Sequence, residues 1–391
     1  METAAELGVD ALIQGTVRRT GGRLRVTVEV SNTRGFVVWS DRFDAADEEL
    51  VALEEKIAAT VLNRVRPDSS RMRANEIRLG PEALDSMGDI VRGRQLLELQ
   101  TPNSLRQAIT VFERVVATAP DYARGHSGIA DATCDMFRLG LVRHRDARSR
   151  AHEAARRALR IDASSVEAHA SAATIAAWID FDAAKAEASF TTSLGLGESA
   201  RTQRIFGIFL TMRERHAEAS VMLRRARELE PLSTHQGIAE AICHFQSRRF
   251  EIVRDRLGPR TRELPAEARF HVALAEIYDG DTALATAIAA GWEDDTSGFP
   301  SLAFARGELE ARLGRPELAR TLLASDHIAT HFATATLALS VGDDERAIRE
   351  LALSIEDRET DRAWIRTDIR LDALRNTAAF ECLADRVREG S

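Results

Sequence analysis

The sequence contains few of the residues that build disulfide-stapled or membrane-spanning proteins. Its three cysteines, Cys134, Cys243 and Cys382, lie far apart, so neither a disulfide framework nor a zinc-ligand spacing is indicated. No uncharged apolar run reaches the about 18 residues of a membrane span, and no basic segment followed by an apolar run opens the chain. We therefore expect no membrane span and a cytoplasmic location, with the periplasmic side of a membrane-anchored relative as the alternative.

Aromatic residues and lysine are also scarce. Aromatics make up 5% of the chain while alanine is abundant, a mixture that favours closely packed helices over a β-sandwich. The formal net charge of −8 differs from the basic balance of nucleic-acid binders, so we expect no nucleic acid as a partner of this chain itself. Lys56 and Lys185 are the only lysines, and we interpret the use of arginine as a compositional bias toward Arg and Ala.

The common motifs of catalytic and metal sites are missing from the sequence. It contains no G-x-x-x-x-G-K-[ST], G-x-G-x-x-G, H-E-x-x-H or C-x-x-C. His327 and His331 are four residues apart, but no further ligands at a recognisable spacing accompany them. Asp180 and Asp182 lie in a predicted turn, where Asp commonly caps the next helix. We therefore predict no catalytic residues, no metal, no cofactor and no enzymatic activity.

The first seventy residues alternate apolar and polar positions, as half-buried strands do. The pattern predicts strands at Ala11–Thr20, Arg23–Asn32 and Gly35–Asp44, joined by two hairpins into an antiparallel meander. A helix with one apolar face is predicted at Asp47–Val65. Three strands leave an exposed edge, and a homodimer through this sheet edge is a further expectation.

This segment carries a family resemblance in the motifs "GTVRR" (residues 15–19) and "WSDRFD" (residues 39–44), followed by an acidic helix start. With these motifs, Glu6 to Pro67 resemble the later half of the TolB-like amino-terminal domain of bacterial regulatory proteins. The earlier strand and helix of that domain are missing here. The resemblance implies a module between an upstream output domain, such as a winged helix or a nucleotide cyclase, and a downstream helical array. We therefore expect either that this chain lacks such an upstream domain or that another element covers the sheet edge.

The rest of the chain repeats one pattern of small residues. In the stretch from Phe206 to Pro231, Gly207, Ala219 and Ala226 stand at the positions where two helices of a tetratricopeptide repeat cross, and the proline ends the second helix. Comparable windows recur seven or eight times, with small residues at Ala108, Ala130, Ala173, Ala241, Ala275, Gly307 and Ala335. The weakest window is Asp279–Ser297, which predicts a single short helix.

After the last repeat, Arg362–Val387 loses the pattern and predicts an irregular segment followed by a capping helix. This ending also resembles the one that follows the repeats in TolB-like and tetratricopeptide regulators. We predict a mainly α protein: a small α+β module of three antiparallel strands and a helix at residues 1–70, an α-α superhelical solenoid at 71–357, and an irregular C-terminal cap at 358–391.

A solenoid of this kind presents its first helices on a concave groove, where partners bind. The candidate partner-binding residues are those predicted to point away from both neighbouring helices: Thr174, Trp178, Arg201, Arg204, Ile208, His235, Ile238 and Phe245. Arginines beside apolar residues suit an extended or acidic peptide segment. The arginine-rich stretch at residues 138–160 is interpreted instead as a solvated outer surface.

The leading interpretation of function is a non-enzymatic regulatory scaffold that binds a protein or peptide in this groove. The alternatives are the regulatory portion of a signalling nucleotide cyclase whose catalytic domain is absent, the sensory portion of a winged-helix transcription regulator, and a remnant without an independent role.

Overall fold

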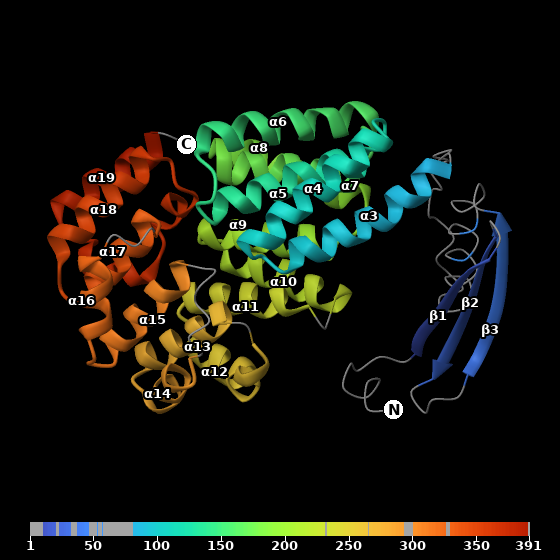
Figure 1. Cartoon of the computed structure of the whole chain (residues 1–391). Helices are drawn as coiled ribbons and strands as arrows, with labels where there is room; N and C mark the ends of the chain where they lie inside the picture. The colour runs from blue at the N-terminus through green and yellow to red at the C-terminus, as the bar shows by residue number, and fades with distance from the viewer. Residues whose placement is uncertain are drawn as a thin grey trace. The chain divides into compact units, whose positions relative to one another are not determined.

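The computed structural model describes residues 11–20, 23–32, 37–46, 53, 57, 81–230, 233–264, 266–292, 300–325 and 329–389. The chain divides into two compact units, residues 1–91 with 114–120 and residues 92–113 with 121–391. The first unit contains a small sheet, drawn in blue in Figure 1, and the second unit contains most of the helices.

The sheet is the predicted antiparallel meander. Its strands β1 (Ala11–Thr20), β2 (Arg23–Asn32) and β3 (Val37–Ala46) pair in the order β1-β2-β3. β3 ends beyond the predicted end at Asp44. A register shift between Val30 and Ser31 interrupts the pairing of β2 with β3.

One face of this sheet is apolar because alternate residues point the same way. Val28 and Phe43 on this face are buried, and Leu53 packs against them in helical conformation together with Ile57. Apart from Leu53 and Ile57, the helix predicted at 47–65 lies outside the described residues.

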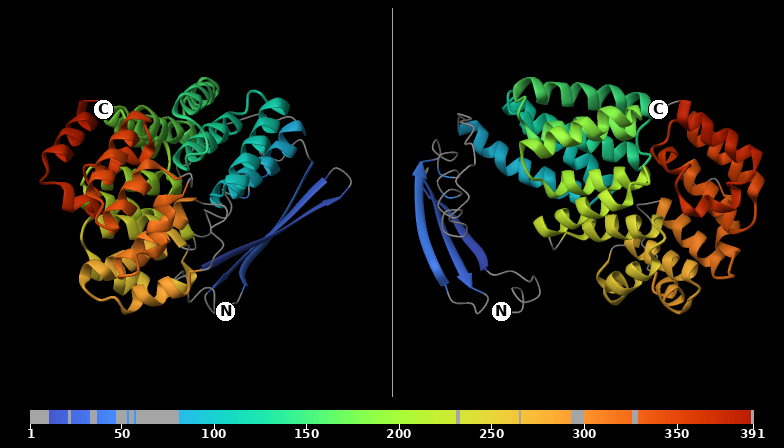
Figure 2. Two further views of the ribbon diagram at one scale, coloured as in Figure 1. Left: turned by 60° about the vertical axis from the view of Figure 1, so that its left-hand side comes forward. Right: turned by 180° about the vertical axis from the view of Figure 1, so that it is seen from behind.

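The helices follow one another as hairpins, so the mainly α, tetratricopeptide-like solenoid that the repeats predict is confirmed (Figure 2). The hairpins, each given as first and second helix, are α3 (Pro81–Glu98) with α4 (Pro102–Thr118), α5 (Ala123–Arg138) with α6 (His144–Ile161), α7 (Val166–Ile175) with α8 (Ala183–Leu196), α9 (Ala200–Met212) with α10 (His216–Leu229), α11 (Thr234–Gln246) with α12 (Phe250–Leu257), α13 (Ala266–Asp279) with α14 (Ala283–Ala290), α15 (Pro300–Arg312) with α16 (Glu317–Ala324), and α17 (His331–Ser340) with α18 (Asp344–Glu356). A π-turn, η2 (Ala176–Asp180), extends α7, and a 3-10 turn, η3 (Gly258–Glu263), extends α12.

The small residues lie where neighbouring helices pack closely, both within a hairpin and between successive hairpins. A Cβ atom added to Gly207 of α9 would lie 2.7 Å from the side chain of Leu223 of α10. On α3 and α5, Cβ atoms added to Gly93 and Gly128 would each lie 2.5 Å from the ring of Phe112, which is fully buried. Close backbone approach therefore explains the repeated pattern, since any larger side chain would hold the helices apart.

The two aspartates of the turn before α8 have different roles, which corrects the prediction that both cap a helix. The side chain of Asp182 accepts a hydrogen bond from the backbone N–H of Lys185, as an N-cap does. Asp180 instead contacts His152 at 2.8 Å and Arg148 at 3.2 Å on α6. The π-turn accounts for the difference, because it inserts an extra residue ahead of the turn and directs Asp180 toward α6.

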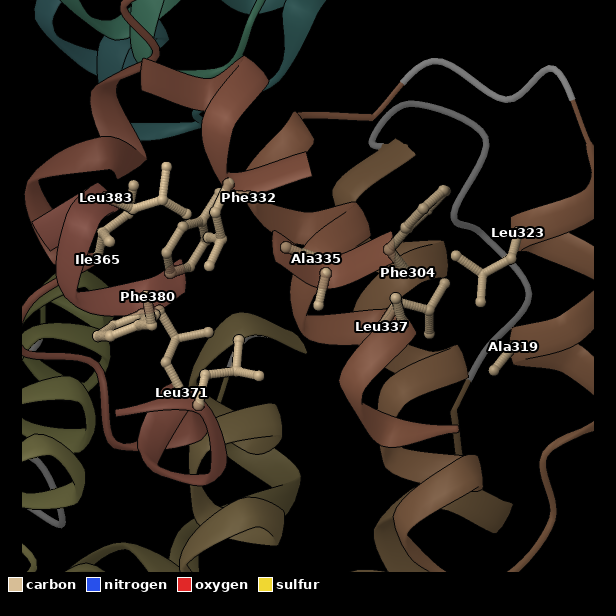
Figure 3. Packing of buried hydrophobic residues seen from close by; sticks show 14 of the residues in the cluster. Phe304, Ala319, Leu323, Phe332, Ala335, Leu337, Ile365, Leu371, Phe380 and Leu383 are labelled. Atoms are coloured by element: carbon tan, nitrogen blue, oxygen red, sulfur yellow. The ribbon is translucent and has the colours of Figure 1, made fainter. Parts of the chain in front are cut away.

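The C-terminal part matches the predicted irregular segment followed by a helix. It consists of the 3-10 turns η4 (Thr360–Trp364) and η5 (Ile369–Leu374) and the helix α19 (Ala378–Glu389). Figure 3 shows Ile365, Leu371, Phe380 and Leu383 from this part packed in one apolar cluster with Phe332 and Ala335 of α17. The cluster covers the apolar surface of the last hairpin, as the end of a solenoid requires.

Candidate functional site

The first helices α5, α7, α9, α11, α13, α15 and α17 contact one another in chain order. We call the surface that they form, with α3 before them, the first-helix face. All eight predicted partner-binding residues belong to α7 with its π-turn, to α9 or to α11. All eight positions therefore belong to helices of the first-helix face.

The predicted arginine Arg201 lies within a network of buried polar groups. Its guanidinium is 3.2 Å from the carboxylate of Asp131 on α5, which is 1% exposed. The same carboxylate accepts hydrogen bonds from Arg94 of α3 at 2.7 Å and from the hydroxyl of Ser171 of α7 at 2.6 Å. Asp131 thus links four first helices, and the guanidinium of Arg201 is paired with a carboxylate of the chain itself.

Arg204 and His235 share a second carboxylate, that of Glu98 at the end of α3. The distances to Glu98 are 3.8 Å from Arg204 and 3.0 Å from His235. Burial by itself raises the pKa of Glu98, but the hydrogen bond from His235 and the charges of Arg204 and Arg201 lower it to about 2. The carboxylate is therefore ionised at neutral pH, and it brings together three of the predicted residues.

Several side chains that the sequence analysis did not select belong to the same region. Glu98 and Asp131 were missed, although Asp131 directly follows the repeat's small residue Ala130 on a first helix. Gln203 and Gln236 are buried beside the arginines, and each has at least one side-chain amide atom without a hydrogen-bond partner among the described residues. The Nε of Arg204 is likewise without a partner there. Buried polar atoms without partners retain the capacity to bind.

The predicted apolar residues occupy two kinds of environment. Trp178 and Ile208 belong to one apolar cluster, which also includes Ala363 and Trp364 of the C-terminal segment. Ile238 is half-buried. Ile208 and Ile238 are partly exposed on the first-helix face, whereas Trp178 is buried at 8% exposure.

Two predicted residues lie elsewhere, and we do not retain them as candidates. Phe245 is 0% exposed and packs against Phe250 and Tyr278 in the core. The buried hydroxyl of Thr174 donates a hydrogen bond to the carbonyl of Ala170 one turn earlier. Their helical positions are close to those of surface residues, but neighbouring hairpins cover their side chains.

The C-terminal segment 360–374, which we call the tail, returns along the first-helix face. Near its start, the guanidinium of Arg362 lies over the ring of Phe181. Further on, the backbone N–H of Ile369 donates a hydrogen bond to the side-chain oxygen of Gln246 on α11 at 3.1 Å, and Asp372 is paired with Arg248. An irregular segment thus contacts helices that precede it by more than a hundred residues.

Arg370 of the tail is held by two carboxylates and two rings. Its guanidinium is 2.7 Å from Asp368 and 3.2 Å from Glu308 of α15, and Glu308 is 2% exposed. The guanidinium carbon lies 5.9 Å from the ring centre of Phe270 and 5.5 Å from that of Phe332. Burial lowers the pKa of Arg370, but the charges of Asp368 and Glu308 outweigh it and raise this pKa.

A cavity of about 360 Å³ remains between the tail and the helices beside Arg370. It is lined by Arg370 and Asp372 of the tail and by Tyr278 of α13, Arg312 of α15 and Leu339 of α17. The tail therefore does not fill the first-helix face completely.

The remaining candidates from the sequence show no metal site. Among the described residues, no group of three or more potential ligands gathers. His331 contacts Glu350 at 2.7 Å and Asp357 at 3.3 Å, while His327 lies outside the described residues.

In the arginine-rich stretch, Arg150 and Arg157 pair with exposed acids, Glu113 and Asp121. No described helix is long and apolar enough to cross a bilayer.

Comparisons with known proteins give relatives of limited extent. No model of a known protein family matches the chain. The putative adenylate cyclase 3 of Rhizobium meliloti (strain 1021) is 27% identical over 134 residues, which are 33% of this chain and 22% of that protein, so the match spans about a fifth of its length.

The chain also shows a low similarity to several solved structures. Human IFIT1, in a dimer with m7Gppp-AAAA, is 14% identical with a TM-score of 0.43, covering 87% of this chain and 77% of that one. PilF of Pseudomonas aeruginosa is 19% identical with a TM-score of 0.29, covering 67% of this chain and 99% of that one. The TPR domain of P58(IPK) is 12% identical with a TM-score of 0.23, covering 78% of this chain and 98% of that one.

Proposed function

We propose that this chain is a non-enzymatic regulatory scaffold whose first-helix face binds an extended segment of a partner protein. One observation carries the proposal: this face already holds an irregular segment, the tail, through a backbone hydrogen bond to Gln246 and through ion pairs and aromatic contacts. Helical repeats recognise peptides by combining such main-chain and side-chain contacts.

The cluster of Arg201, Arg204, Glu98 and His235 adds a charged part to this proposed surface. Glu98 is 47% exposed, so the carboxylate of a partner can reach Arg204 and His235 by exchanging with it. Such an exchange replaces one ion pair by another without leaving a buried charge unpaired.

Site-specific photo-crosslinking of the full chain tests this proposal. A photoreactive residue in place of half-buried Ile238 samples the first-helix face, and one in place of Val221, 46% exposed on the second helix α10, is the matched control. In cells of the source organism we expect a defined adduct from position 238 and none from position 221. Adducts from position 221 alone, or from neither position, contradict the proposal.

A second candidate function is the regulatory portion of a nucleotide cyclase. It is favoured by the match to a putative adenylate cyclase and by the resemblance of residues 6–67 to the TolB-like module. A chimaera tests this second function: in the relative, the 134 matched residues are replaced by the corresponding residues of this chain. Cyclic AMP formation that persists and changes when residues of the inserted part are substituted supports a regulatory role, and formation unaffected by such substitutions argues against it.

The remaining expectations are part of the same proposal. We propose the cytoplasm as the compartment. We also propose a homodimer that forms through strand β1, where the side chains of Ile13 and Val17 are more than half exposed. An association constant from sedimentation of the chain and of its Val17→Lys variant tests the dimer, since a charge on the edge strand opposes pairing.

A further inference from the structure

The seat of Arg370 is assembled from residues of four first helices. Gln246 of α11, Phe270 of α13, Glu308 of α15 and Phe332 of α17 all contact tail residues 369 or 370. These residues are spread over more than eighty positions in the sequence, and the packing of successive hairpins brings them to one place.

Each of these contacts recognises a different chemical feature of a bound segment. The amide oxygen of Gln246 accepts the N–H of the residue before the arginine, which recognises main chain independently of its side chain. Glu308 offers an almost fully buried carboxylate, and the two phenylalanine rings flank the guanidinium. Outside them, Arg248 pairs with the acid two residues after the arginine.

We infer that this seat is a docking site for an arginine-bearing segment of a partner protein, folded as a short 3-10 turn and of the form Asp-apolar-Arg-apolar-acidic, and that the tail is its internal occupant. This inference rests on the proposed function and names the chemistry of the partner. The tail shows which segment the seat accepts: residues 368–372 read Asp-Ile-Arg-Leu-Asp, and the side chains of Ile369 and Leu371 are buried.

Arginine fits this seat better than lysine. A guanidinium is planar and can bond two carboxylates at once while its faces contact rings, whereas an ammonium is a compact, strongly hydrated charge. Here Glu308 and Asp368 each bond a different nitrogen of Arg370. A lysine would make at most one of these contacts well.

The seat is accessible at its rim. Arg248 is 55% exposed, and the cavity of about 360 Å³ borders Arg370 and Asp372. A competing segment can therefore bind first at the rim and then replace the tail. As an attached segment the tail has an effective concentration of about millimolar, so a free peptide binds well only when the tail is loosened.

The test measures binding of a fluorescein-labelled peptide of residues 366–376 to the full chain by fluorescence polarisation. Two variants loosen the tail without changing the seat: Asp372→Ala removes the tail's acid from the rim and leaves Arg248 for the peptide, and Arg370→Ala removes the seated side chain. We expect each variant to bind the peptide about tenfold more tightly than the unchanged chain. Arg225→Ala, which removes an exposed pair with Glu198 on the second helix α10, is the control and leaves binding unchanged.

Two further arms test the chemistry of the seat. Adding Glu308→Gln to Asp372→Ala is expected to weaken binding about tenfold, as is replacing the peptide's arginine at position 370 by lysine (Arg370→Lys in the peptide). Circular dichroism shows whether Glu308→Gln unfolds the chain. The comparison of the arginine and lysine peptides needs no further change in the protein, so it tests the preference of the seat for arginine even in that case.

The outcomes separate the two proposals. Equal binding of the arginine and lysine peptides, or no gain from either loosened variant, overturns the arginine seat. If crosslinks still form at position 238, the first-helix face remains a partner surface with a different specificity. If no crosslinks form there while the peptide binds as expected, the seat serves the tail alone and the proposed function fails.

Discussion

The guanidinium carbon of Arg362 lies 3.5 Å from the centre of the Phe181 ring. Phe181 ends the π-turn after α7 with a left-handed backbone, φ 59°, which directs its ring toward the tail. Arg358 lies over the same ring at 5.9 Å. One aromatic residue at a turn of the third hairpin thus holds the segment that follows the eighth.

We expect this contact to stabilise the chain measurably. In a double-mutant cycle of Phe181→Leu and Arg362→Met, the coupling free energy should be about 1 kcal/mol, the usual range for a partly buried cation–π pair. Urea unfolding of the four proteins measures it. Additive effects of the two substitutions would show that the ring and the guanidinium contribute independently.

The ionised state of Glu98 predicts a pH dependence. Because its pKa falls from 4.5 to about 2 on folding, Glu98 contributes stability above pH 4.5 that is lost as the pH falls toward 2. The difference in free energy of unfolding between the unchanged chain and Glu98→Gln should therefore be largest near neutrality and shrink below pH 4.5. A pH-independent difference for Glu98→Gln would contradict the assignment.

Asp361 predicts the opposite trend. Burial and the neighbouring charge of Glu359 raise its pKa to about 6. Its ionised form is thus disfavoured in the folded chain, and stability is lost as the pH rises from 3.8 toward 6. Asp361→Asn should raise the melting temperature at pH 7.5 and change it little at pH 4. Equal changes at both pH values would show that the carboxyl group is not responsible.

Two glycines in helices give a matched test of the repeat crossings. Gly207→Ala should destabilise the chain by about 1–3 kcal/mol, because the new methyl group meets the side chain of Leu223. Gly195→Ala in α8 meets no atom within 4 Å and should stabilise it by about 0.5–1 kcal/mol, since alanine favours helix. Chemical denaturation measures both, and the same sign for the two would contradict close packing at Gly207.

The hairpins could be predicted from the sequence because their determinants are local. The small residue on one helix and its partner on the next, such as Gly207 and Leu223, lie within a single repeat. Helical spacing also placed Arg201 and Arg204 on a first helix. It could not show that Asp131 and Glu98 neutralise them, because those acids belong to hairpins two and three repeats earlier and several acids there have suitable spacing.

The same reasoning explains the two misplaced residues and the tail. The position of Phe245 around helix α11 differs from that of its surface residues by only a fraction of a turn. The packing of α13 against α11 decides which of these side chains is buried. The seat of Arg370 depends on a hydrogen bond to a residue 123 positions earlier, so its residues form no pattern along the chain. Reversing the charges of Arg201 and Arg204 is consequently a poor test of binding, since an acid beside Asp131 would destabilise the fold.

The ring of Phe112 occupies the space that side chains at both Gly93 and Gly128 would otherwise need. The helices α3, α4 and α5 therefore pack against one another around this ring, and a substitution at any one of the three positions affects the other two. A smaller residue at 112 leaves a void beside Gly93 and Gly128, so a redesign of α3, α4 and α5 has to choose these three residues together.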